Sequence, residues 1–157
     1  QIVITFNTYG AYGHPDHIKI NQATQAAFQL LQSEREHPQK LYYISGSSQI
    51  FRIEIWFLRL CGQDPRKRGE NNDMDYIAAL EATTAVTTKI DVSKYLEFTW
   101  KVSNCYISQI QRPPAAGRFR KLLGPLLQGT TRLSRVYPVW RPGERLEHDL
   151  FENMLLD

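Results

Sequence analysis

The stretch of the sequence richest in reactive side chains is TYGAYGHPDH, residues 8–17, which holds two histidines and an aspartate within four positions. His14 and His17 are three residues apart at the expected start of a helix, so their imidazoles can face the same side. This spacing allows one imidazole to bind a metal ion while the other faces a substrate. Asp16 can accept from an imidazole N–H, and Tyr12 can donate to a developing oxyanion. The stretch is a candidate reaction centre, with helix capping and loop packing as the simpler alternative.

Two histidines do not complete a metal site. Structural zinc has four protein ligands, and catalytic zinc usually has three plus a water molecule. The other two histidines, His37 and His148, lie in a loop-like context and in an acidic C-terminal context, and neither is favoured as a ligand. We therefore expect the cluster to be one part of a site whose other groups come from elsewhere.

The elements around the cluster would place it at the edge of a sheet. Residues 2–6 form a β-branched and aromatic run that predicts a strand covered on both faces. Residues 7–13 are the predicted loop, in which Gly10 and Gly13 allow sharp turns, and Pro15 suits the first turn of the next helix. In open α/β sheets ligands bind beyond the carboxyl ends of the strands, which is where this loop would lie.

Strands and helices alternate along the rest of the chain. Further strands are expected at residues 41–44, 86–92 and 133–137, and helices after Pro15, at residues 49–61 and at residues 94–111, with an exposed loop at residues 63–75. Apolar residues at helical spacing identify the first two helices: Ile20, Ala23, Ala27, Leu30 and Leu31 in one, and Ile50, Ile53, Trp56, Phe57 and Leu60 in the other. The alternation predicts an α/β fold, a Rossmann-like three-layer sandwich with a largely parallel sheet.

Length and composition fit one ordinary soluble domain, with 157 residues of which 42% are hydrophobic and 22% charged. The formal charge of +3 is unevenly spread, since residues 112–145 hold eight basic residues and one acid. A solvated basic face, or a contact with an acidic part of the same protein, explains this best because no nucleic-acid-binding motif accompanies the charge. Nucleic acid is therefore not an expected partner, and residues 112–157 are expected to be an irregular, Pro-rich and basic extension.

The cysteines and the apolar runs indicate the compartment of the protein, and the first residues indicate whether further protein lies upstream. Cys61 and Cys105 lie in apolar settings without CxxC spacing, which predicts buried free thiols and favours a reducing cytoplasm. No apolar run approaches the ~18 residues of a membrane span, so no membrane crossing is expected. Gln1 leads directly into a predicted strand without a signal-peptide pattern, and we expect further protein upstream of it.

The stretch IVITFNTYGAYGHPDHIKINQATQAAF resembles the second signature of the LmbE-like/PIG-L family of metal-dependent de-N-acetylases and amidases. In that family a strand leads through a loop with glycine and tyrosine to HPDH. LYYIS, TTKIDVSKYLE and RPGERLEHDLFENML also resemble the family's carboxyl half. The resemblance covers most of the chain and implies that residues 1–157 are a single partial domain, the carboxyl half of a deacetylase domain.

The resemblance implies roles for four residues. The last histidine of HPDH is a zinc ligand in the family, which points to His17, and the first polarises the scissile carbonyl, which points to His14. Asp16 would support His14, and Tyr12 would contact the oxyanion or the substrate. The implied cofactor is Zn²⁺, with Fe²⁺ or another divalent ion as the alternative. The implied substrate is a small N-acylated molecule, an amino sugar or a thiol conjugate that loses its N-acetyl group.

This sequence departs from the family pattern at three places. It lacks AHPDD, the family's first signature, which supplies a histidine and an aspartate to the metal and a second aspartate as general base. We therefore expect an amino-terminal half of the same protein to be the partner, and this chain alone to be inactive. The alternative is a non-catalytic binding module or domain remnant. Asn7 stands where an acid is common and Tyr106 stands where a histidine is expected, so the resemblance does not define the contacts to the substrate. The sequence likewise does not decide whether the protein forms a homo-oligomer.

Overall fold

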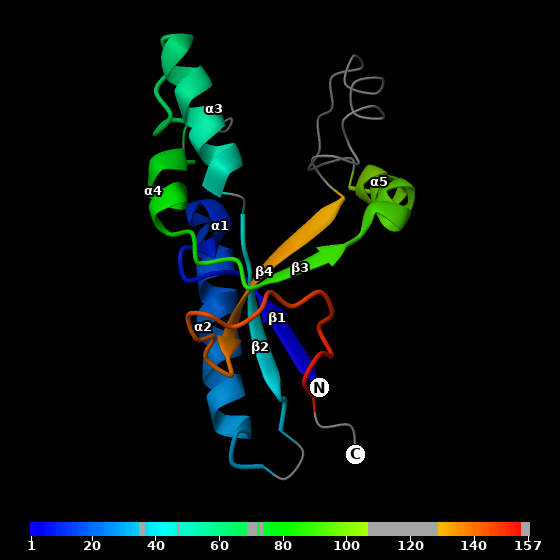
Figure 1. Cartoon of the computed structure of the whole chain (residues 1–157). Coiled ribbons are helices and arrows are strands. Elements are labelled where there is room, and N and C mark those ends of the chain that lie inside the picture. Colours follow the sequence, from blue (N-terminus) through cyan, green and yellow to red (C-terminus); the bar gives the residue numbers. More distant parts are fainter. Residues whose placement is uncertain (35–36, 47, 69–71, 73, 107–128, 155–157) are drawn as a thin grey trace. The chain divides into compact units, whose positions relative to one another are not determined.

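The computed structural model describes residues 1–34, 37–46, 48–68, 72, 74–106 and 129–154 (Figure 1). These residues form an α/β fold, as the sequence predicts. In chain order the elements are β1 (Ile2–Thr5), α1 (Gly10–Gly13), α2 (Pro15–Leu31), β2 (Lys40–Ile44), α3 (Ser48–Leu60), α4 (Tyr76–Glu81), β3 (Thr88–Asp91), the 3₁₀ turn η1 (Ser93–Tyr95), α5 (Leu96–Asn104) and β4 (Thr130–Tyr137).

The four described strands form one mixed sheet in the order β1-β2-β4-β3. β1 pairs parallel with β2, with Ile2 opposite Lys40, whereas β2 pairs antiparallel with β4, with Tyr43 opposite Ser134. The largely parallel, Rossmann-like arrangement predicted from the sequence is therefore not confirmed. A β-prone run predicts a strand, but the direction in which that strand pairs depends on its partners in the folded chain.

The chain divides into two compact units, one of residues 1–88 and 132–157 and the other of residues 89–131. The first unit contains TYGAYGHPDH and the helices α1 to α4, and the second contains η1 and α5. The strand predicted at residues 133–137 is confirmed as part of β4. The single partial domain and its irregular extension from residue 112 stay predictions, and residues 107–128 of the predicted helix and basic segment lie outside the described residues.

A buried charge network anchors the C-terminal segment to the sheet of the first unit. Lys40 lies on β2 with its side chain almost fully buried, and its Nζ donates to Glu147 Oε1 at 2.9 Å. The same ammonium donates to the carbonyl oxygens of Leu150, at 3.1 Å, and Glu152. Because Nζ also reaches the Tyr42 hydroxyl at 3.1 Å, the charge is well hydrogen-bonded despite its burial.

Glu147 is the acceptor at the centre of this network. Its Oε2 accepts from the Tyr42 hydroxyl at 2.8 Å and from Thr88 Oγ1 at 2.7 Å, and its Oε1 also accepts from Arg135 Nη1 at 2.7 Å. Burial opposes ionisation of this carboxyl, but the donors from Thr88, Lys40, Tyr42 and Arg135 outweigh it and lower its pKa. Burial and the carboxylate together raise the pKa of the Tyr42 hydroxyl, which therefore stays protonated and donates.

The apolar side chains that predicted α2 and α3 are largely exposed. On α3, Ile53, Trp56, Phe57 and Leu60 are 57–68% exposed, whereas Ile55 and Leu58 are buried. On α2, Ile20, Leu30 and Leu31 are exposed as well, whereas Asn21 and Phe28 are buried. Helical periodicity thus predicted both helices, but which face is covered depends on the neighbouring elements.

The prediction about the two cysteines is confirmed in part. Cys61 and Cys105 are free thiols as predicted, but the prediction that they are buried is wrong, since both are exposed. Each follows the last residue of a helix, so the apolar residues beside it in sequence do not enclose it in space.

Within the described residues, no helix is long and apolar enough to cross a membrane.

Replacing Glu147 tests the network. Glu147→Gln leaves the buried Lys40 and Arg135 charges without their carboxylate, so we expect the free energy of unfolding at neutral pH to fall by about 3–5 kcal/mol. Because the folded pKa is lowered, the ionised carboxylate stabilises the fold above the ordinary glutamate pKa of about 4.3 and this stabilisation is lost as the pH falls through the folded value. Urea unfolding of wild type and variant at several pH values measures both effects.

Glu152→Gln is the matched control, because the exposed Glu152 side chain accepts a backbone N–H, from His148, and a glutamine oxygen can do the same. Its unfolding curve should match that of the wild type. Equal stability of Glu147→Gln and Glu152→Gln would show that the network contributes nothing to folding.

Candidate functional site

The loop after β1 reverses direction tightly before α2. Sequence analysis predicted a loop at residues 7–13, and the structure forms the short helical turn α1 within it, closed by the Gly13 N–H donating to the Tyr9 carbonyl at 3.0 Å. The turn is distorted, because Gly10, Ala11 and Gly13 all have positive φ, of 66°, 66° and 94°. The sharp turns predicted at the two glycines are confirmed.

Gly10 is required by close packing as well as by its backbone conformation. A Cβ at this position would lie 2.9 Å from both Cγ1 and N of Ile18 and 3.0 Å from Cβ of His17. Only the absence of a side chain lets the turn lie this close to the first residues of α2. The position of Gly10 therefore determines where the His17 imidazole lies.

His17 is held on two sides, by Gly10 and by Phe6. Its Nδ1 lies 3.2 Å from the Gly10 carbonyl oxygen, and its ring stacks on Phe6 with centroids 3.9 Å apart and an interplanar angle of 4°. A carbonyl oxygen can only accept, so Nδ1 carries the proton and the neutral ring keeps its lone pair on Nε2. Histidines that bind metals show this arrangement, in which a backbone carbonyl fixes the tautomer.

His14 has the opposite tautomer. It is the N-cap of α2, and its Nδ1 accepts from the Asp16 N–H at 3.2 Å. With the Nδ1 lone pair occupied, the proton of the neutral ring is on Nε2, which makes His14 a donor at its outer nitrogen. The two imidazoles thus have complementary properties, an acceptor at Nε2 of His17 and a donor at Nε2 of His14.

Three of the four predicted site residues, Tyr12, His14 and His17, lie together, whereas the Asp16 side chain is exposed at the rim of this cluster. The ring centroids of His14 and His17 are 4.8 Å apart, and that of Tyr12 is 5.9 Å from His14 and 5.4 Å from His17. Asp16 has a side chain 82% exposed, with Oδ2 3.9 Å from His14 Nδ1, which is too long for a hydrogen bond. The Asp16 backbone, not its carboxylate, orients His14 here. The catalytic and metal-binding roles stay predictions.

Asn21 is a positioning residue that sequence analysis missed. It is 1% exposed, and its Nδ2 donates to the Phe6 carbonyl at 2.7 Å while its Oδ1 accepts from Gln25 Nε2, also at 2.7 Å. It thereby ties the end of β1 to α2, one helical turn beyond His17. A polar residue four positions after a candidate ligand on the same helix was the signal that could have revealed it.

Helix α4 contacts α1, the turn within this loop, and sequence analysis also missed it. Asp75 caps it by accepting from Ile77 N at 2.9 Å and Ala78 N at 3.0 Å, and pairs with Arg66 at 3.0 Å. Burial, reinforced by the Asp75 carboxylate, raises the pKa of the Tyr9 hydroxyl. An aspartate directly before YIAALE was the capping signal in the sequence.

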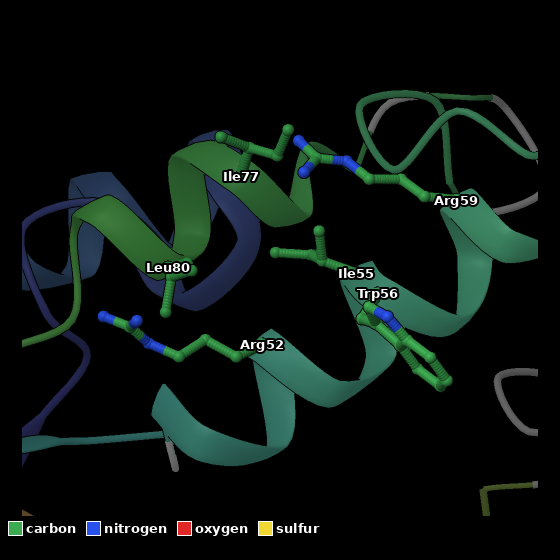
Figure 2. A pocket seen from close by; sticks show the side chains of 6 residues that line it. All are labelled: Arg52, Ile55, Trp56, Arg59, Ile77 and Leu80. Atoms are coloured by element: carbon green, nitrogen blue, oxygen red, sulfur yellow. The ribbon is translucent and has the colours of Figure 1, made fainter.

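A pocket of about 260 Å³ lies between α3 and α4. Figure 2 shows its lining, with two arginines on α3 flanking apolar side chains of both helices: Arg52, Ile55, Trp56, Arg59, Ile77 and Leu80. It contains none of the predicted site residues. The candidate site is thus the open face of residues 7–17, hereafter the histidine loop, and not this pocket.

The described part of the chain does not by itself form a complete metal site. No group of three or more His, Cys, Asp or Glu side chains there could hold a metal ion. Tyr106, where the family resemblance led us to expect a histidine, is 59% exposed.

Comparison with known proteins supports the resemblance. No family model matches the chain, and no solved structure matches it. Five curated proteins do match, all named 1D-myo-inositol 2-acetamido-2-deoxy-alpha-D-glucopyranoside deacetylase. The protein of Acidothermus cellulolyticus is 30% identical over 110 residues, which are 70% of this chain and 36% of the relative. That of Actinosynnema mirum is 24% identical over 153 residues, which are 96% and 51%.

The resemblance to LmbE-like deacetylases is thereby confirmed. A third relative, from Thermobifida fusca, is 30% identical over 102 residues, 62% of this chain and 35% of its own length. The chain spans about half the length, or less, of the curated relatives it matches. That the matched part is the carboxyl half stays a prediction.

Substitution of Gly10 tests the coupling between the turn and His17. Gly10→Ala adds a Cβ that meets Ile18 and His17, so we expect a loss of stability beyond the ~1–2 kcal/mol cost of positive φ and a changed His17 ring resonance. Gly62→Ala is the control, because Gly62 also has positive φ, of 69°, but has no atom within 4 Å of the added Cβ. Urea unfolding and NMR of the histidine rings compare the two variants. Equal effects of Gly10→Ala and Gly62→Ala would contradict the coupling between the turn and His17.

Proposed function

We propose that this chain supplies one half of the active site of a metal-dependent hydrolase that removes an N-acyl group, in the first instance acetyl, from a small amino-sugar or thiol-conjugate substrate. The observation that carries the proposal is the pair of backbone contacts that assign opposite tautomers to His14 and His17, beside Tyr12, just beyond the carboxyl end of β1. The matched relatives are named as deacetylases of an acetamido sugar, which is the same reaction class.

The residues present suit a bound zinc ion at His17. Its Nε2 lone pair is free because the Gly10 carbonyl holds the proton on Nδ1, and the stacked Phe6 ring fixes the imidazole plane. When bound, zinc supplies an activated water and polarises the scissile carbonyl. Zn²⁺ is the proposed cofactor, with Fe²⁺ as the alternative, since imidazole accepts both.

His14 and Tyr12 supply donors for the negative charge that develops on the substrate's carbonyl oxygen. The Asp16 N–H orients His14 so that Nε2–H points away from the helix it caps. The Tyr12 hydroxyl is the second donor. A donor placed at such an oxyanion contributes about 3–4 kcal/mol to catalysis in known enzymes.

The remaining groups are proposed to come from an amino-terminal half of the same protein. The matched residues make up 34–51% of the relatives, which leaves room for a general base and further ligands outside this chain. We propose that the same half adds parallel strands that complete a Rossmann-like sandwich in a cytoplasmic enzyme, and that the 157-residue chain alone is inactive.

A non-catalytic binding module is the second candidate. It is favoured by one observation, that the described residues contain no group of three side chains able to hold a metal. This candidate and the hydrolase differ in metal content and turnover of the intact protein.

Substitution of the two histidines tests the proposal in the intact protein. His17→Ala should abolish binding of about one zinc per chain, because it removes the only ligand proposed on this chain. His14→Ala should keep the zinc and lose about 10²–10³-fold in turnover of an N-acetylglucosaminide, because it removes an oxyanion donor. Metal analysis by mass spectrometry and release of acetate provide the two measurements.

His37→Ala is the control, since His37 is remote in sequence from the loop and its Nδ1 lies 3.0 Å from the Glu34 carbonyl oxygen. It should bind zinc and turn over substrate as the wild type does. An intact wild-type protein that binds no zinc and releases no acetate would refute the hydrolase and leave the binding module.

A further inference from the structure

Asn7 uses both polar atoms of its side chain inside the protein. It follows β1 and is 5% exposed. Its Oδ1 accepts from the Ala11 N–H at 2.9 Å, and its Nδ2 donates to the Ala82 carbonyl at 3.3 Å. Its own carbonyl accepts from the Gly10 N–H at 2.9 Å. A side chain so occupied is not available to contact a substrate, and its function must be sought in what it holds.

The first group it holds is a strained backbone. Ala11 has φ of 66° and ψ of −65°, a conformation that residues with a side chain rarely adopt. Such a conformation persists only where neighbouring contacts over-determine it, and the hydrogen bond from Ala11 N to Asn7 Oδ1 is one of these. Ala11 directly precedes Tyr12, so the orientation of this peptide sets the direction in which the Tyr12 ring leaves the chain.

The second group it holds is the end of α4. Ala82 is the C-cap of that helix, and the Ala82 N–H donates back to Ala78. In Figure 1, α4 lies next to α1, and the two elements are in contact. The bond from Asn7 Nδ2 to the Ala82 carbonyl therefore connects the histidine loop to a neighbouring helix.

On these contacts we propose that Asn7 is a positioning residue for the hydrolase proposed above. Its Oδ1, by accepting from Ala11, fixes the peptide that aims Tyr12 at the two histidines. His17 is held independently, by Gly10 and Phe6, so loss of the Asn7 contact should displace Tyr12 and leave the metal ligand in place. The inference rests on the proposed function, and it separates positioning of the oxyanion donor from binding of the metal.

Two substitutions isolate the Oδ1 contact. Asn7→Ala removes both hydrogen bonds, whereas Asn7→Asp has the same shape and keeps an acceptor for Ala11 but cannot donate to Ala82 when ionised. In the intact protein we expect Asn7→Ala to lower kcat about 10–100-fold and Asn7→Asp to restore it to within about fivefold of the wild type. The zinc dissociation constant, from competition with a chelator, should stay within about threefold for both variants, in contrast to the tenfold or greater change typical of a lost ligand support.

Thr8→Ala is the matched control, because Thr8 is the exposed neighbour of Asn7 in the same loop. It should leave kcat and zinc affinity unchanged. Wild-type kcat in Asn7→Ala would overturn the proposal, as would an Asn7→Asp variant as impaired as Asn7→Ala. Asn7→Asp keeps the proposal falsifiable if Asn7→Ala does not fold, since a loss of kcat beyond tenfold in that isosteric variant alone contradicts the role of the acceptor.

An NMR readout separates failure of this inference from failure of the proposed function. Nuclear Overhauser effects between the Tyr12 and His17 rings report the loop geometry whether or not the protein hydrolyses anything. They should be present in the wild type, lost in Asn7→Ala and kept in Asn7→Asp. Their persistence in Asn7→Ala would overturn the positioning role, whereas absence of zinc and turnover in the wild type would overturn only the hydrolase.

Discussion

The carboxylate of Glu147 is the interaction on which the architecture of the first unit most depends. It accepts from side chains on β2, at the start of β3 and on β4, and the lysine that it pairs with also holds two carbonyls of the C-terminal segment. Removing one partner from such a buried network leaves the others uncompensated, which costs far more than an exposed ion pair is worth. The sheet next to the histidine loop is therefore held by buried polar contacts in addition to apolar packing.

The histidine loop is organised by its backbone. The Gly10 carbonyl places the proton of His17 on Nδ1, and the Asp16 N–H places the proton of His14 on Nε2. Chemically identical side chains three residues apart thereby become one acceptor and one donor. Positive φ at three positions of the turn makes this possible, and the contacts of Asn7 with Ala82 and of Asn21 with Phe6 tie the start of the turn to the end of α4 and to α2.

The exposed apolar side chains are consistent with the proposal that this chain works with further protein. Large apolar residues on α2 and α3, and Ile4 on the edge strand β1, are exposed, although strands that pair in parallel are usually covered on both faces. The matched relatives are two to three times longer than the segments they share with this chain. A deacetylase domain completed by an amino-terminal half would give these surfaces a partner.

Local patterns in the sequence determined the α/β class, the main strands and helices, and the grouping of Tyr12, His14 and His17, because helical spacing and turn residues act over a few positions. Only the tertiary structure decided the antiparallel pairing of β4, the face of α3 that is buried, the exposure of both cysteines and the place of Asp16 at the rim. It also decided that Asn7 faces Ala11 and Ala82, and that Glu147 meets Lys40 across 107 positions. Those outcomes depend on partners distant in the chain, which no local pattern can specify.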